Sequence, residues 1–215
     1  MPGAPFAIKA GGFIKGAGHG HPFKDRYGND WYAATIVVAS KEHYERRIGI
    51  FPAFYKDGYA HAITEYMDFP FILPDKKVNF SQHNISAGMN LLSYNKQMKA
   101  SSSLGVHQAK MATDEDIRTW WSAASGKRGE WLQMDLSKPM ELSALQISFS
   151  DEGFKTYRHD KNVPIYQYIV EGSLNGTDWQ LLADRSQNTK DQIYELIVLD
   201  LSLIHISEPT RPRLI

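Results

Sequence analysis

The chain has 215 residues, and its 24 Lys and Arg balance its 24 Asp and Glu, so the formal net charge is zero. A balanced charge gives no electrostatic basis for binding nucleic acid or an anionic membrane, and no apolar run reaches the ~20 residues that a membrane span needs. Because the chain has no cysteine, it can form neither disulfides nor thiolate metal sites. The length allows one large domain or two small ones, and no obligate protein partner is evident.

Residues 20–75 alternate short strand patterns with tight turns. The turn sequences YGND at 27–30 and KDG at 56–58 combine Gly with Asn or Asp, which favour turn conformations. A few strands leave the faces and edges of a sheet uncovered, so this piece is not expected to fold well by itself. The predicted strands span residues 22–25, 31–38, 47–55 and 59–64.

Three motifs stand out in this part: GAGHGHPF at 16–23, DRYGNDW at 25–31, and RRIGIFPAF with KDG at 46–58. In these motifs and their order, residues 1–75 resemble the last blade and closing strands of the five-bladed β-propeller of glycoside hydrolase family 43. The resemblance implies that the catalytic Asp and Glu residues precede this part. No catalytic residue can be assigned here, and we expect the chain to be inactive by itself.

The same resemblance gives a role to His19, which matches the His of the family's Gly-x-Gly-His motif. That histidine lies near the propeller axis and helps to hold a central metal, often calcium. Because calcium prefers oxygen ligands, His19 would act through a bound water. The alternative is a structural histidine in a turn.

Residues 76–87 contain Lys and polar side chains after Pro74, and they are predicted to link two domains. The segment 88–199 then carries a second set of motifs. In EWLQMDL at 130–136, apolar and polar residues alternate with the period of two that predicts a half-buried strand. In VEGSLNGTDW at 170–179, Asn175-Gly176 between apolar runs predicts a hairpin.

Together with ATDEDIRTWW at 112–121, these motifs resemble the discoidin, or coagulation factor 5/8 type C, module. That family is a β-sandwich jelly roll, and in bacterial enzymes it usually acts as a carbohydrate-binding module. Where its Asp-Gly-Asp turn has Gly, this chain has Glu115. The expected fold is thus all-β, with a partial β-propeller (its last blade) followed by a truncated β-sandwich jelly roll.

The resemblance suggests a calcium ion at the acidic turn of the module, with oxygens from Asp114 and Asp116. Calcium takes six to eight oxygen ligands, and turn carbonyls and Thr119 could supply others. The alternative is a solvated acidic turn that caps a short helix.

Aromatic residues in this part suggest both a core and a ligand surface. Trp121 and Trp131 are predicted to fill the core of the sandwich. Trp120 is expected to be exposed, where its ring could stack on a sugar or pack on the surface. Tyr157 and Arg158 lie in a loop between strands, where the fold places ligand loops. The alternative, a loop of solvated charges, is the simpler explanation of that loop.

Residues 201–211 match the in-frame translation of a sequencing-library transposon adapter, so we expect residues 200–215 to be a non-native tail on a fragment of a longer gene. The alternative is a native apolar tail. The function expected from both resemblances is that of a secreted or cell-surface hydrolase of arabinofuranosyl or xylosyl linkages, whose partner is a polysaccharide or oligosaccharide. A non-catalytic lectin or adhesin is the rival, and a sulfatase or sialidase-like enzyme would not account for GAGHGHPF.

Overall fold

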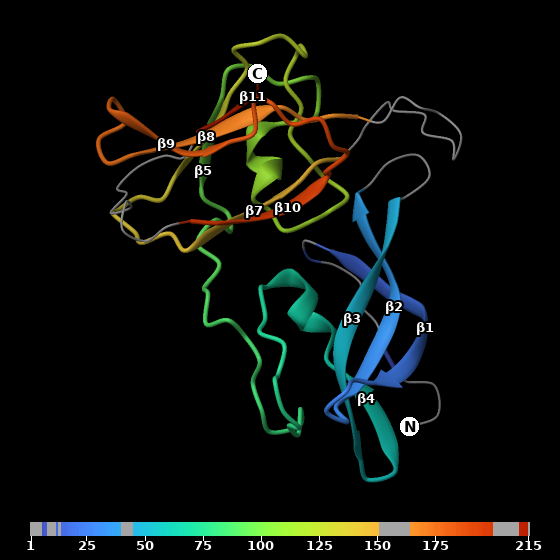
Figure 1. Cartoon of the computed structure of the whole chain (residues 1–215). Coiled ribbons are helices and arrows are strands. Elements are labelled where there is room, and N and C mark those ends of the chain that lie inside the picture. The colour runs from blue at the N-terminus through green and yellow to red at the C-terminus, as the bar shows by residue number, and fades with distance from the viewer. Residues whose placement is uncertain are drawn as a thin grey trace. The chain divides into compact units, whose positions relative to one another are not determined.

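The computed structural model describes residues 6–7, 12, 14–39, 45–150, 164–199 and 211–214. The chain forms two compact units, of which the first extends to Asn90 and the second contains Leu91 onward (Figure 1). Strands and two short 3-10 helices make up the regular structure of the described residues, which confirms the all-β prediction. Within those residues, no helix has the length and apolar character needed to cross a membrane.

The first unit contains one antiparallel sheet in which four strands follow one another in chain order. All four predicted strands are present, although β1 begins well before the predicted 22–25. The hairpin between β3 and β4 turns at Asp57 and Gly58, which both have positive φ, as a two-residue turn of this hand requires. The strands are β1 (Lys15–Lys24), β2 (Asp30–Ala39), β3 (Glu45–Lys56) and β4 (Tyr59–Ala62).

Asp25 organises the predicted turn between β1 and β2. One carboxylate oxygen accepts the backbone N–H groups of Tyr27 and Asn29 at 2.8 and 2.9 Å. The other accepts the side-chain N–H groups of Asn29 and Trp31 at 2.8 and 3.0 Å. Burial opposes ionisation of Asp25, but these four hydrogen bonds outweigh it and lower its pKa to about 2.

The segment predicted as a linker packs against this sheet. The buried side chains of Phe80 and Ile85 form a cluster with Trp31, whose ring lies 4.8 Å from that of Phe80. The buried Asn29 adds a polar connection, because its side-chain amide bonds to the backbone of residues 76 and 78. A 3-10 helix, η1 (Thr64–Asp68), leads from β4 into this segment.

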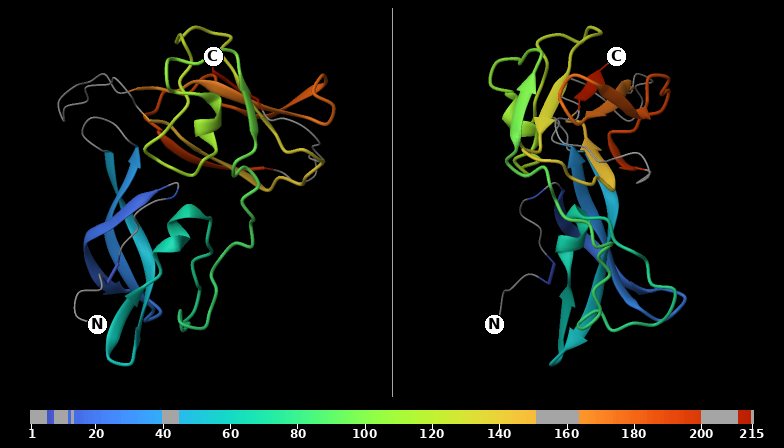
Figure 2. Two further views of the ribbon diagram at one scale, coloured as in Figure 1. Left: turned by 180° about the vertical axis from the view of Figure 1, so that it is seen from behind. Right: turned by 90° about the vertical axis from the view of Figure 1, so that its left-hand side faces the viewer.

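The second unit is built from three small antiparallel sheets, with strand orders β11-β8-β9, β10-β7 and β5-β6. The sheet of β8 and β9 lies over that of β7 and β10 (Figures 1 and 2). The strands are β5 (Gln97–Ala100), β6 (Leu132–Asp135), β7 (Ala144–Ser148), β8 (Tyr168–Ser173), β9 (Trp179–Asp184), β10 (Tyr194–Val198) and β11 (Arg211–Leu214), and a 3-10 helix, η2 (Ala109–Ala112), follows β5. Strand β11, within the predicted non-native tail, pairs with β8.

The core of the second unit consists of aliphatic side chains and one tyrosine from both layers. Its buried members are Leu136, Leu142, Tyr168, Val170, Ala183, Ile197 and Leu199. The predicted alternation in β6 is confirmed, because Leu132 and Leu136 are buried and Met134 packs on this core. The predicted hairpin is confirmed as well, since the turn containing Asn175 and Gly176 joins β8 to β9.

Candidate functional site

A stacked pair of rings lies on the loops that precede β6. The imidazole of His107 and the indole of Trp120 have ring centroids 4.5 Å apart and planes inclined by 18°. Both side chains are half-buried, so Trp120 is less exposed than the sequence suggested. Contact with His107 fixes the plane of the indole and leaves part of the pair accessible to a ligand.

Apolar side chains accompany this pair in the loop that carries His107. Leu104 and Val106 are 50% and 73% exposed, while the backbone N–H of His107 donates to the Leu104 carbonyl at 3.0 Å. Gly105 between them has φ +54°, a conformation that glycine adopts without steric cost. The tight loop therefore holds apolar side chains in solvent close to His107 in the sequence. Apolar surface beside a few polar groups is typical of sites that bind small ligands.

Glu130 fastens the loop after β5 to the loop before β6. Its carboxylate accepts hydrogen bonds from the hydroxyls of Ser101, Ser102 and Ser125, the last two at 2.7 Å. These hydrogen bonds lower the pKa of Glu130 to about 2, so the group is ionised at neutral pH. The backbone N–H of Trp131 donates to the Ser101 hydroxyl at 2.9 Å, which ties the same loop to the start of β6.

The two tryptophans predicted for the core are only half-buried, which corrects that prediction. Among the described residues, the core cluster of the second unit includes neither Trp121 nor Trp131. The indole N–H of Trp121 instead donates to the carbonyl of Ser102 at 3.0 Å. Trp131 directly precedes β6, and its position alternates with that of the buried Leu132, so the inward side of the strand is occupied by aliphatic residues.

The acidic turn is held together by its own hydrogen bonds. Asp114 accepts the backbone N–H of Asp116 at 3.0 Å and the hydroxyl of Thr119 at 2.6 Å. The carboxylate of Asp116 accepts hydrogen bonds from Nε and Nη2 of Arg118, at 2.8 and 2.7 Å. Glu115 has φ +58°, the left-handed conformation that explains why the family has Gly at this position.

These contacts bear on the calcium prediction. Both carboxylates of the turn already serve as acceptors, and Asp116 faces a cation. In the part of the chain that the structure describes, no group of three or more His, Cys, Asp or Glu side chains is placed to hold a metal ion. In this arrangement Thr119 and Arg118 engage the two carboxylates, so a calcium ion, which needs six or more oxygens, would have to displace Arg118 from Asp116. Calcium binding here stays a prediction.

His19 lies in β1 with an exposed side chain and φ +50°. The pairing of β1 with β2 shifts register between Gly18 and His21, so His19 occupies a bulge. The Cβ of any residue replacing Gly20 would come within 2.2 Å of the Ala33 carbonyl and 2.6 Å of the Tyr32 ring. The GHGH sequence thus shapes an irregular strand, and its metal role remains a prediction.

Tyr157 and Arg158 lie outside the described residues, so their predicted contact with sugar remains a prediction. His107 and Glu130 were not predicted. A histidine that stacks across a loop gives no local periodic signal. Glu130 opens the strand predicted at 130–136, whereas the serines at 101–102 follow β5, a strand that the sequence patterns did not predict, so no local signal connected them.

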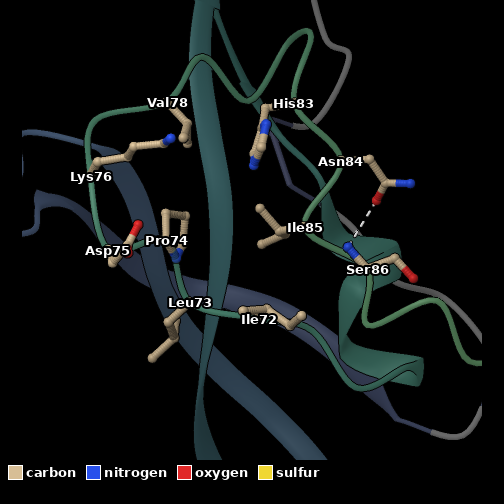
Figure 3. A pocket seen from close by; sticks show the side chains of 10 residues that line it. All are labelled: Ile72, Leu73, Pro74, Asp75, Lys76, Val78, His83, Asn84, Ile85 and Ser86. Atoms are coloured by element: carbon tan, nitrogen blue, oxygen red, sulfur yellow. Dashed lines mark hydrogen bonds between the residues drawn. The ribbon is translucent and has the colours of Figure 1, made fainter.

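The first unit has a hollow of about 340 Å³ within residues 72–86 (Figure 3). Ile72, Pro74, Val78 and Ile85 supply its apolar wall. Polar side chains line the rest, including those of Asp75, Lys76, His83, Asn84 and Ser86. The Asn84 amide oxygen accepts the Ser86 backbone N–H at 2.8 Å, which fixes one side of the hollow.

Comparison with protein families gave a match to the F5/8 type C domain over residues 97–200. The search of curated proteins found no match. Similar solved structures include CpGH89CBM32-4 of Clostridium perfringens, in complex with GlcNAc-α-1,4-galactose. It is 21% identical, with a TM-score of 0.48, and the match covers 62% of this chain and 84% of that chain.

Another is chitosan-binding module 2 from a chitosanase/glucanase of Paenibacillus sp. IK-5, in complex with chitotriose. It is 19% identical, with a TM-score of 0.47, over 58% of this chain and 86% of that chain. The family match covers most of the unit that contains the sandwich and the His107–Trp120 pair. Residues 97–200 are an F5/8 type C domain.

Proposed function

We propose that residues 97–200 bind carbohydrate and hold a polysaccharide-degrading glycoside hydrolase, of which this chain is a part, on its polymer. The observation that carries the proposal is the stacked pair of His107 and Trp120 on the loops of an F5/8 type C domain. The apolar face of a pyranose matches an aromatic plane, and neighbouring polar groups can bond to its hydroxyls. Attachment to the polymer raises the effective substrate concentration near the enzyme. We propose Tyr157 and Arg158 as further contacts with the sugar, because the sequence places them in a loop where this fold has its ligand loops.

The hydrolase part of the proposal rests on the first unit. Its four-stranded antiparallel meander has the strand arrangement of one propeller blade, and its motifs follow the order found in glycoside hydrolase family 43. An inverting hydrolase needs two carboxyl groups ~6.5–9.5 Å apart. In the first unit, Asp25 instead accepts hydrogen bonds within its turn, and Asp30 forms an ion pair with Lys24. The proposed parent is secreted, acts on arabinofuranosyl or xylosyl linkages, and carries its catalytic acids elsewhere.

A non-catalytic lectin or adhesin is the second candidate. It is favoured by the family match, which covers only residues 97–200 and thus the sandwich rather than the first unit. Both candidates predict glycan binding by the second unit. They differ in hydrolysis: release of aryl groups from aryl-arabinosides or aryl-xylosides by the full-length parent supports the enzyme, and its absence supports the lectin.

Calorimetric titration of the whole chain tests the binding. We would titrate arabinoxylan oligosaccharides, xylo-oligosaccharides, galactose-terminated disaccharides and chitotriose. Replacing Trp120 by Ala should weaken binding roughly five- to tenfold, because an aromatic stacking contact contributes ~1 kcal/mol. Tyr94→Ala is the matched control, since Tyr94 is an exposed aromatic of the same unit that precedes β5. Absence of binding to the whole panel, or equal affinity of the Trp120 variant, would contradict the proposal.

A further inference from the structure

The carboxylate of Glu130 connects through Ser102 to the segment that carries Trp120. The Ser102 hydroxyl has one proton, which it donates to Glu130, and its oxygen accepts the backbone N–H of Ala124 at 2.9 Å. The Ser102 carbonyl accepts the indole N–H of Trp121 at 3.0 Å. The orientation of the Ser102 hydroxyl, and with it the position of Ala124, therefore depends on the carboxylate.

A backbone connection continues from this point to the stacked rings. The N–H of Leu104 donates to the carbonyl of Ser122 at 2.8 Å, and the N–H of Ser122 donates to the carbonyl of His107 at 3.3 Å. Residues 102–107 thus run beside residues 121–124. The ring pair of His107 and Trp120 lies at the end of this run. Any movement of one loop against the other would change the geometry of the pair.

Glu130 supplies a fixed point for both loops. Ser101 and Ser102 come from the loop after β5, whereas Ser125 comes from the loop that leads into β6. Glu130 itself lies two residues before β6, which is paired with β5. A carboxylate can accept several hydrogen bonds at once, and bonds to an ionised acceptor are stronger than those between neutral groups. The sheet, the carboxylate and the serines together hold both loops on a rigid base.

We propose that Glu130 is a positioning residue for the His107–Trp120 pair, acting through Ser102 to present both rings in one arrangement to a glycan. The part of this proposal that concerns a glycan rests on the proposed carbohydrate binding. A surface that is fixed before binding loses less conformational entropy when the ligand binds. Holding the two rings in place should therefore raise the affinity for the ligand.

The first test compares Glu130→Ala, Glu130→Gln and the exposed control Glu141→Ala in the whole chain. Glu130→Ala should weaken binding of the best oligosaccharide in the panel about tenfold, because three hydroxyls lose their charged acceptor. Glu130→Gln keeps one acceptor oxygen, which can serve Ser101 and Ser102, so it should recover much of the affinity. Glu141→Ala should bind as the wild type does. Equal affinity of Glu130→Ala and wild type would overturn the proposal.

The second test needs no ligand. In ¹H–¹⁵N spectra, the indole resonance of Trp121 and the amides of Leu104 and Ala124 report whether the loops are held. Glu130→Ala should shift these signals and speed their hydrogen exchange, while signals of β8 stay in place. Unchanged signals would overturn the proposal even if affinity fell. If these signals change but the wild type binds no glycan of the panel, the positioning of the loops is supported and the carbohydrate function fails. Ser102→Ala removes one donor to Glu130 and the acceptor of the Ala124 N–H, so it provides the readout through the Trp121 and Leu104 signals if Glu130→Ala does not fold.

Discussion

The phenol O–H of Tyr168 donates a hydrogen bond to the carboxylate of Glu195, with 2.7 Å between the two oxygens, and this bond joins the two layers of the sandwich. The other oxygen of Glu195 accepts two hydrogen bonds from the Arg185 guanidinium at 2.8 and 2.6 Å. Burial works against ionisation of Glu195, but the hydrogen bonds of Arg185 and Tyr168 outweigh it and lower its pKa. Burial and the bond to Glu195 raise the pKa of Tyr168. Both shifts keep a neutral phenol beside an ionised carboxylate at neutral pH.

Replacing Tyr168 by Phe should lower the free energy of unfolding of the second unit by about 1–2 kcal/mol, because a buried carboxylate loses one donor while keeping Arg185. Urea denaturation at neutral pH measures the change. Tyr94→Phe, at an exposed position of the same unit, should leave stability unchanged. A Tyr168→Phe variant as stable as wild type would show that the bond between the layers contributes nothing net.

Local sequence patterns predicted the elements but not the contacts between distant segments. The strand at 130–136 and the hairpin at Asn175-Gly176 were predictable because period-two alternation and turn residues are local signals. The bond from Val78 to Asn29 and those from Ser101 and Ser102 to Glu130 join residues far apart in the sequence. No periodic pattern reports such pairs.

Trp131 shows how a resemblance can override a correct pattern. The alternation itself groups Trp131 with Gln133 and Asp135, opposite Leu132 and Leu136. The family resemblance favoured a core tryptophan, yet the structure buries the leucines and leaves Trp131 half-buried. The physical pattern was the better guide at this position.

Asp25→Asn should destabilise the first unit by about 1–2 kcal/mol, a modest value because the turn is partly solvated. Each oxygen of Asp25 accepts two donors, so whichever oxygen the amide nitrogen replaces, two N–H groups face a donor. Hydrogen exchange of residues 76–80 would report the loss, since Asn29 holds that segment. Asp57→Asn, in an exposed turn with φ +52°, should be neutral because Asn tolerates that conformation.

The same carboxylate predicts a dependence of stability on pH. The pKa of Asp25 in the folded chain is about 2, below its ordinary value of 3.8. Its contribution is therefore present above pH 3.8 and is lost as the pH falls through about 2. The difference in unfolding free energy between wild type and Asp25→Asn should shrink over that range in urea titrations at several pH values. A difference that stays constant down to the lowest pH would contradict the assignment.

Gly20→Ala should disrupt the pairing of β1 with β2, whereas Gly18→Ala should not. A Cβ at residue 20 would overlap the Ala33 carbonyl and the Tyr32 ring, while a Cβ at residue 18 meets nothing within 4 Å. Forced overpacking of this kind costs ~1–3 kcal/mol or more. Thermal unfolding of the two variants gives the comparison directly. Similar midpoints for both would mean that the strand moves aside without cost.

The acidic turn of the second unit gives a prediction about calcium. Because Asp114 and Asp116 already accept hydrogen bonds from Thr119 and Arg118, we expect the turn to keep its structure without a divalent cation. The midpoint of thermal unfolding should then be the same in excess EDTA and in millimolar calcium. Asp114→Ala should lower it in both buffers, since the lost hydrogen bonds do not depend on a metal. A rise of the wild-type midpoint with calcium concentration that disappears in Asp114→Ala would instead establish the calcium site suggested by the sequence, with Arg118 displaced from Asp116.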